Sequence, residues 1–260
     1  MGLFGKLFEK KICSVCGEEI KLLGNRKLED GNLCKDCAKK LSPWFDDRRH
    51  STVEQIAAQL RYREENLAAL ASFRPTRTLG RDTVVMIDEG QRRFLVSKTG
   101  DPEQENSDII DLDQVTGCDL DIDHEEDEVM RRDSEGNEIS YTPPRFRHSF
   151  DFNIIIRVRH PYFDEMRFRL NRSSVTVETV GRQGIFGNIG ANPMRDVNYQ
   201  EYERMGREIC DTLMNARQET IDTIAADNAP KQKVTCPYCG ATTTPDASGC
   251  CEFCGGSVAG

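Results

Sequence analysis

Two cysteine pairs, Cys13-Ser-Val-Cys16-Gly17 and Cys34-Lys-Asp-Cys37, decide how the start of this chain folds, and seventeen residues separate Cys16 from Cys34. A gap of two residues lets a single tight turn direct both sulfurs at one ion, and two such pairs form a four-cysteine zinc site. Gly17 can adopt the left-handed backbone conformation that closes the first turn. Asp30-Gly31, between the pairs, predicts a hairpin turn.

The same pattern returns near the other end of the chain, as Cys236-Pro-Tyr-Cys239-Gly240 and Cys251-Glu-Phe-Cys254-Gly255. Eleven residues separate Cys239 from Cys251, and a glycine again follows the second cysteine of each pair. This spacing predicts a second four-cysteine site. The neighbouring Cys250 leaves the register open, and Cys251 is favoured because it keeps the two-residue gap to Cys254.

The chain contains eleven cysteines and no export signal, which indicates a reducing compartment where paired thiols bind metal rather than form disulfides. A redox dithiol is the alternative, but such a pair normally begins a helix within a strand-helix-strand pattern, and neither pair has that setting. We therefore expect two structural Zn²⁺ ions, each bound by four thiolates. The predicted ligands are Cys13, Cys16, Cys34 and Cys37 for one ion and Cys236, Cys239, Cys251 and Cys254 for the other. Cys118 and Cys210 are predicted to be small buried side chains.

The composition describes a water-soluble chain with a modest core, because apolar residues make up 37% of its 260 residues and charged residues 30%. No stretch approaches the roughly 20 apolar residues of a membrane-spanning helix, so we expect a cytoplasmic protein. Residues 1–11 could form a short helix with Leu3, Phe4, Leu7 and Phe8 on one face, which allows a peripheral membrane contact. The alternative is that this leader packs on the first cysteine module or on a neighbouring subunit.

The middle of the chain predicts an α+β fold with an antiparallel, β-rich central domain. A capping box at Ser51-Thr-Val-Glu54 opens an amphipathic helix that should end before Pro75. Strands are expected at 84–87, 94–96, 109–112, 115–122, 150–159 and 166–170, the first two joined by a turn at Asp88-Glu-Gly90. A second capping box at Asn198 to Glu201 then opens a long amphipathic helix.

These features give the following expected organisation: a cysteine module with its leader at 1–50, a connecting helix at 51–74, a β domain with a C-terminal helix at 80–224, a linker at 225–233 and a second cysteine module at 234–260. Residues 125–144 are charged and end in two prolines, and residues 181–193 contain four glycines. Both stretches are predicted to be loops.

The first part of the chain resembles a bacterial family that is catalogued as a domain of unknown function. The resemblance rests on the four cysteine positions 13, 16, 34 and 37, on Leu22-Leu-Gly-Asn-Arg-Lys-Leu28 and on Lys40-Leu-Ser-Pro43, and it extends through Arg48 to Thr52 and Thr76 to Gly80. It therefore covers about residues 11–80 and implies that the four cysteines act together. The order of strands followed by one helix is also similar to bacterial pleckstrin-homology-like or GRAM-like domains, a likeness of architecture that names no ligand.

No catalytic residues are predicted, because His50, His124, His148 and His160 stand apart in the sequence without an accompanying motif. Asp119-Leu-Asp-Ile-Asp123 lacks the glycine and glutamate of a calcium loop and is predicted to be a strand with a solvated acidic face. We expect a non-enzymatic adaptor whose zinc modules bind protein partners, while the central domain is a scaffold that can also bind a peptide or a lipid. Nucleic-acid binding is the alternative, since the first module is basic, but sixteen acidic residues against two basic ones between Asp101 and Glu138 would repel phosphate.

Overall fold

The computed structural model describes residues 11–181, 192–228, 233–246 and 248–258, together with the backbone of residues 183–184 and 187–188. The chain divides into two compact units between Gln218 and Glu219, and each unit is described by itself. The expected leader helix at 1–11 lies almost entirely outside the described residues, as does most of the predicted loop at 181–193. Among the described helices, none combines the length and apolar composition needed to cross a membrane.

The first cysteine module is a small fold built on a two-stranded hairpin and a short helix. Strands β1 (Arg26–Lys27) and β2 (Asn32–Leu33) pair antiparallel around the predicted turn at Asp30-Gly31. Helix α1 (Lys35–Lys39) follows, and then a 3₁₀ turn, η2 (Asp47–His50). The core of the module contains few side chains besides the cysteines, chiefly Ile20, Leu28, Leu33, Leu41 and Ile56.

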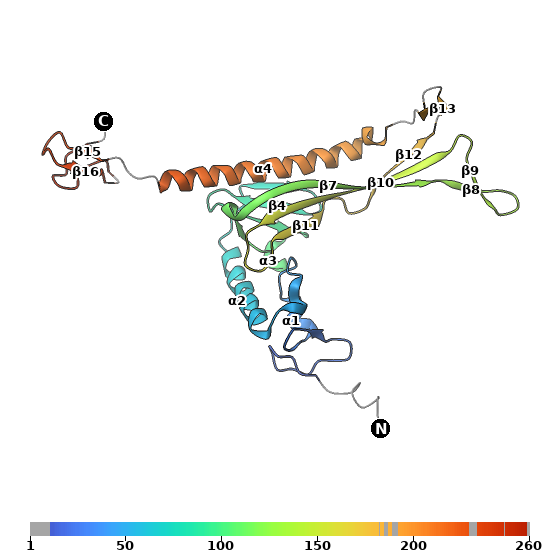
Figure 1. Ribbon diagram of the computed structural model, residues 1–260, viewed down its shortest axis with the longest axis horizontal. Helices are drawn as coiled ribbons and strands as arrows, with labels where there is room; N and C mark the ends of the chain where they lie inside the picture. The colour runs from blue at the N-terminus through green and yellow to red at the C-terminus, as the bar shows by residue number, and fades with distance from the viewer. Residues whose placement is uncertain are drawn as a thin grey trace. The chain divides into compact units, whose positions relative to one another are not determined.

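Helix α2 (Val53–Leu70) connects the module to the sheets (Figure 1) and ends before Pro75, as predicted. Its capping box lies one residue later than expected, because the Thr52 side chain accepts a hydrogen bond from the Gln55 N–H while the Gln55 side chain accepts one from the Thr52 N–H. The buried face of α2 also differs from an apolar stripe: Leu67 is exposed, whereas Arg63 is buried and pairs with the fully buried Asp108.

The first sheet is an antiparallel meander of four strands, β3 (Arg77–Gly80), β4 (Val84–Asp88), β5 (Arg93–Ser97) and β6 (Ile110–Asp111). The hairpin predicted around Asp88-Glu-Gly90 joins β4 to β5. A short helix, α3 (Pro102–Glu105), lies between β5 and β6, and the turn η3 (Leu112–Gln114) follows β6. Strand β3 was not predicted, because its four residues carry little apolar alternation.

The second sheet is organised around one long central strand, β10 (Arg145–Val158), which pairs antiparallel with β7 (Val115–Glu128) along one edge. On its other edge β10 pairs first with β12 (Val175–Val180) and then with β11 (Glu165–Arg169). Asn171 fills the gap between these two, since its side chain accepts a hydrogen bond from Phe152 N–H and donates one to the carbonyl oxygen of Phe150. Buried backbone groups at the junction are thereby satisfied.

The predicted loop at 125–144 is wrong for much of its length. Residues 125–128 continue β7 and pair with Phe146 to Ser149 of β10, and β8 (Met130–Arg132) pairs with β9 (Glu138–Ser140) in a hairpin beyond them. The charge and the prolines of this segment had suggested a loop. Residues 125–128 nevertheless form a strand, because they pair with β10. Two further short strands, β13 (Gln183–Gly184) and β14 (Gly187–Asn188), pair with each other.

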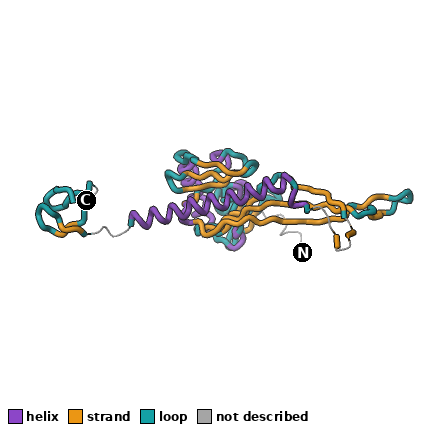
Figure 2. Tube along the Cα trace, turned by 90° about the horizontal axis from the view of Figure 1, so that it is seen from above, coloured by secondary structure: helices purple, strands orange, loops and turns teal. Residues whose placement is uncertain are grey.

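Helix α4 (Val197–Asp227) follows the turn η4 (Pro193–Arg195) and contributes to the central core (Figures 1 and 2). Its first N–H groups are capped by Asp196, which accepts from Asn198 and Tyr199, so the predicted cap at Asn198 lies two residues too late. Tyr199, Ile209 and Leu213 pack with inner-face residues of both sheets. Gly206 faces Leu120 of β7, where a Cβ would lie 2.6 Å from its Cδ1.

The outcome is a mixed α+β fold with mostly antiparallel sheets, a C-terminal helix and a four-cysteine cluster toward each end of the chain. The pleckstrin-homology-like expectation rests on this order of elements, in which a four-stranded sheet is followed by a second sheet and then by a helix. The second unit contains one further hairpin, β15 (Val234–Thr235) with β16 (Thr242–Thr243).

Candidate metal centres

The first cluster is positioned by two turns of the N-terminal module. The turn after Cys13 is closed by Gly17, which has a φ of +76° and donates its N–H to the carbonyl oxygen of Cys13 at 2.9 Å. Cys34 and Cys37 lie at the start of α1, where Cys34 is the capping residue. The four Sγ atoms all lie within 4.8 Å of one another. The predicted quartet Cys13, Cys16, Cys34 and Cys37 is therefore brought together.

Backbone N–H groups favour a thiolate in this cluster. Burial alone would raise the pKa of Cys13, but backbone hydrogen bonds from Cys16, Cys34 and Val15 lower it to about 6. Burial and the neighbouring sulfurs raise the pKa of Cys37. Negative charge on one sulfur opposes ionisation of the next, and a bound dication removes that conflict.

The sulfur separations fit one tetrahedral ion. Zinc binds cysteine at about 2.3 Å, so the sulfurs of a tetrahedral site are about 3.8 Å apart. Sγ of Cys16 lies 3.8 Å from Sγ of Cys34. Cys13, Cys34 and Cys37 are buried, and only Cys16 is exposed. The cluster can therefore hold a metal ion without rearrangement of its backbone.

The second cluster repeats this design twice within the second unit. Gly240 and Gly255 have φ angles of +72° and +69°, and each donates its N–H to the carbonyl oxygen of the first cysteine of its pair. Sγ of Cys236 lies 3.5 Å from that of Cys254, and Sγ of Cys239 lies 3.8 Å from that of Cys251. Both predicted pairs thus face a common centre.

The structure selects Cys251, and not Cys250, as the member of this cluster. Cys251 is buried, and although burial would raise its pKa, the N–H groups of Phe253 and Cys254 lower it to about 7. Cys250 instead forms an isolated β-bridge with Ser257 and directs its thiol toward the carbonyl oxygen of Ser248.

The remaining two cysteines lie side by side, which the sequence did not suggest. Cys118 is on β7 and Cys210 on α4, and their Sγ atoms are 3.1 Å apart. Both are partly buried rather than fully buried as predicted, because they lie at the margin of the core between the strand and the helix.

A third group of metal-ligating side chains was missed. His124 and His148 stand apart in the sequence but lie across the β7–β10 pair, with Nε2 of His124 3.1 Å from Nδ1 of His148. Glu126 lies beside them, with Oε2 3.3 Å from Nδ1 of His148. A strand register joins these residues, and no short spacing in the sequence announces it.

The first cluster lies within the part of the chain that is similar to a known family. Residues 11–59 match the family model described as a domain of unknown function, DUF4428. The match includes all four cysteines of the first cluster and ends within α2, short of the expected residue 80. The curated proteins and the solved structures that were compared with the chain gave no match.

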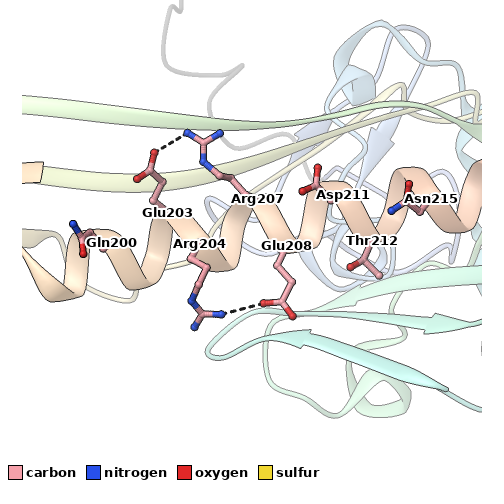
Figure 3. A pocket seen from close by; sticks show the side chains of 8 residues that line it. All are labelled: Gln200, Glu203, Arg204, Arg207, Glu208, Asp211, Thr212 and Asn215. Carbon is pink, nitrogen blue, oxygen red and sulfur yellow. Dashed lines mark hydrogen bonds and ion pairs between the residues drawn. The ribbon is translucent and has the colours of Figure 1, made fainter. Parts of the chain in front are cut away.

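Two other charged surfaces consist of ordinary ion pairs. Figure 3 shows a hollow along α4 whose lining is polar or charged, with pairs between Glu203 and Arg207 at 2.7 Å and between Arg204 and Glu208 at 3.4 Å. Pairs of this spacing are typical of a solvated helix face. Likewise Asp119, Asp121 and Asp123 lie in β7 as predicted, and Asp119 pairs with Arg157 of β10 and Asp121 with Arg167 of β11.

Proposed function

We propose that each four-cysteine cluster binds one structural zinc ion. Zinc is favoured because four thiolates in tetrahedral arrangement are its usual structural site, and because the first module has too few core side chains to fold without a cross-link. Zinc binding to small modules supplies on the order of 10 kcal/mol of folding free energy. Four thiolates leave no coordination position for water, so these ions would stabilise the modules and not catalyse a reaction.

Zinc bound to cysteine can be counted as the metal released by a mercurial reagent that blocks thiols. We expect two ions per chain in the wild type, one in Cys251→Ser and two in the matched variant Cys250→Ser. The two serine variants differ by one position, so general damage to the second module would affect both. Equal release from the two variants would contradict the assignment of Cys251.

We propose further that the protein is a non-enzymatic adaptor whose cysteine modules bind protein partners. The observation that supports this role is the exposure of large apolar side chains on both modules. Leu22 and Leu23 are 88% and 90% exposed on the first, and Tyr238 and Phe253 are 72% and 69% exposed on the second. Aromatic side chains are among the groups that dominate the affinity of protein interfaces, and exposed apolar patches are typical of interaction sites.

The backbone supports an interaction role for these side chains. Tyr238 and Phe253 each lie inside a two-residue cysteine gap, so metal binding would fix the turn that presents them. The Tyr238 ring lies against Gly256, where a Cβ would approach its Cδ2 to 2.6 Å. Leu23 has a positive φ of 63°, an unfavourable conformation for leucine that is common at functional loops.

The adaptor hypothesis is tested with the full chain as bait in extracts of its source cells. We expect a reproducible set of proteins on the wild type that is depleted with the double variant Tyr238→Ser, Phe253→Ser, which keeps every cysteine. Met130→Ser is the matched control, because Met130 is an exposed apolar residue on β8, outside both modules. Identical protein sets on wild type and double variant would refute the role of the second module.

Nucleic-acid binding is the second candidate, and the exposed basic residues of the first module favour it. Lys21, Lys27, Lys35, Lys39 and Lys40 are all exposed. Filter binding of the full chain to DNA and RNA at rising salt tests it, because phosphate contacts make affinity fall steeply with salt concentration. Retention that survives only below about 50 mM salt would leave the adaptor hypothesis as the better account.

A further inference from the structure

His124, Glu126 and His148 lie on the face of the second sheet that also carries the apolar core residues. Along β7 the inward side chains are Leu120, Ile122, His124 and Glu126, because side chains alternate between the two faces of a strand. Opposite them on β10, Phe150 pairs with His124 and His148 pairs with Glu126. Imidazole and carboxylate groups therefore occupy positions where the pattern of the strand would place apolar residues.

We propose that His124, Glu126 and His148 bind a divalent transition-metal ion, such as Zn²⁺, Ni²⁺ or Co²⁺, in a third site that is open to solvent. Two imidazoles select these ions over Mg²⁺ and Ca²⁺, which prefer oxygen ligands. Three protein ligands leave at least one coordination position for water or an incoming ligand. This site is independent of the adaptor hypothesis and has a chemistry that the closed cysteine clusters lack.

The ligand separations already match a metal site. Zinc–nitrogen bonds of about 2.0–2.1 Å place two tetrahedral ligand atoms about 3.3 Å apart. Nε2 of His124 lies 3.1 Å from Nδ1 of His148, and Oε2 of Glu126 lies 3.3 Å from that same Nδ1. All three ligand atoms fall within 4.8 Å of one another. Two of the three separations therefore already fit one ion, and the third, between His124 and Glu126, is no more than 4.8 Å.

Neighbouring groups hold both imidazoles in place. The buried His148 has its other ring nitrogen, Nε2, 2.9 Å from Oγ1 of Thr179 on β12. A proton on Nε2, donated to Thr179, leaves the Nδ1 lone pair directed at the cluster, which is how second partners commonly orient metal-binding histidines. The His124 ring stacks on Phe150 with centroids 4.5 Å apart and an angle of 11°. Phe150 is itself fully buried, so this platform is rigid.

The charge around the cluster also favours a cation. Glu125, Glu126, Asp127 and Glu128 are consecutive on β7, and all four are exposed. A dication at Glu126 would reduce the repulsion among these carboxylates. The alternative to a metal site is a hydrogen bond from His124 to His148 at the same contact. The two interpretations differ in whether an added metal ion displaces that bond.

Calorimetric titration of Ni²⁺ into protein that contains two zinc ions per chain and no excess metal, followed by visible spectroscopy with Co²⁺, tests the proposal. We expect one further ion per chain, and for Co²⁺ weak visible bands without the intense sulfur-to-metal charge transfer of the cysteine sites. His124→Ala should lose measurable binding, and Glu126→Gln should weaken it at least tenfold. Thr179→Val, which keeps the side-chain shape but removes the hydroxyl, should weaken binding about 10- to 100-fold.

Two controls separate this site from nonspecific binding. Asp127→Asn removes the same charge as Glu126→Gln from the adjacent position on the opposite face of β7, and His50→Ala removes an exposed histidine from the first module. Both should bind the third ion as the wild type does. The proposal is overturned if saturating Ni²⁺ adds no ion to the wild type, or if His124→Ala and Glu126→Gln bind it unchanged. A cysteine cluster that lacks zinc and takes up the added Co²⁺ is recognised by its sulfur-to-metal charge-transfer bands, so it is not counted as the third site.

Discussion

Asp108 joins the first cysteine module and α2 to the loop before β6, and replacing it with asparagine should destabilise this junction. Its carboxylate is fully buried and accepts hydrogen bonds from Ser42 Oγ at 2.8 Å, Tyr62 OH at 3.0 Å and Arg63 Nη1 at 2.5 Å. The Arg63 side chain is only 5% exposed, and its Nε donates to the carbonyl oxygen of Lys40. The charged pair therefore lies at a point where three parts of the chain meet.

The magnitude follows from the charge that Asp108→Asn leaves behind. Removing one partner of a buried ion pair typically costs about 3–5 kcal/mol, since the other charge stays buried without compensation. Asparagine has nearly the same volume and keeps one acceptor oxygen, so part of the hydrogen bonding survives. We expect a loss of about 3 kcal/mol in the free energy of unfolding. That is a large share of the roughly 5–15 kcal/mol that stabilises a typical domain.

Urea unfolding at saturating zinc measures this loss, with Asp111→Asn as the matched control. Asp111 pairs with Arg93 at 3.0 Å, but the two side chains are 54% and 37% exposed, so the same substitution there should cost at most about 1 kcal/mol. The difference between the variants therefore isolates the effect of burial. A loss below about 1 kcal/mol for Asp108→Asn, or equal losses for both, would refute the reasoning.

Three further substitutions test local features of the fold. Thr52→Ala removes the side-chain cap of α2 and should lower the free energy of unfolding by about 1 kcal/mol in the same urea assay; no change would show that the capping box is dispensable. Gly80→Ala should lower the free energy of unfolding more than Gly100→Ala does. Both glycines have a positive φ, but only at Gly80 would the new Cβ meet a backbone oxygen, at 2.2 Å. Equal losses would contradict this contact. Burial lowers the pKa of His160, and the Asp108 carboxylate acts in the opposite sense. The unfolded state therefore binds the proton more readily than the folded state, and the free energy of unfolding decreases as the pH falls below about 6.5. Stability measured from about pH 7.5 to 5.5 should therefore decline less steeply in His160→Asn than in the wild type, and parallel curves would argue against this role.

The parts of the fold that depend on local chemistry could be predicted from the sequence. The cysteine clusters follow from two-residue gaps and the glycine after each turn, and the hairpin at Asp30-Gly31 follows from the same kind of short-range signal. The starts of the two long helices were placed within one or two residues, because several polar side chains near each start could act as the cap. Thr52 and Asp196 act as caps where Ser51 and Asn198 were expected.

The parts that depend on pairing between distant segments could not be predicted. Residues 125–128 have the composition of a loop, and only the partner strand β10 makes them a strand. The same register brings His124 to His148, which are separated by more than twenty residues in the sequence, and brings Cys118 on β7 to Cys210 on α4. A single sequence contains no signal for such contacts beyond the alternation of side chains along each strand.

The central position of β10 bears on how the protein is made. Because β7, β11 and β12 all pair with β10, β7 leaves the ribosome before the strand that will cover its edge has been synthesised. An unpaired strand of fourteen residues is a site at which nascent chains can associate with one another. The seven carboxylates along β7 oppose that association by mutual repulsion, and the arginines that later neutralise two of them arrive on the very strands that complete the sheet.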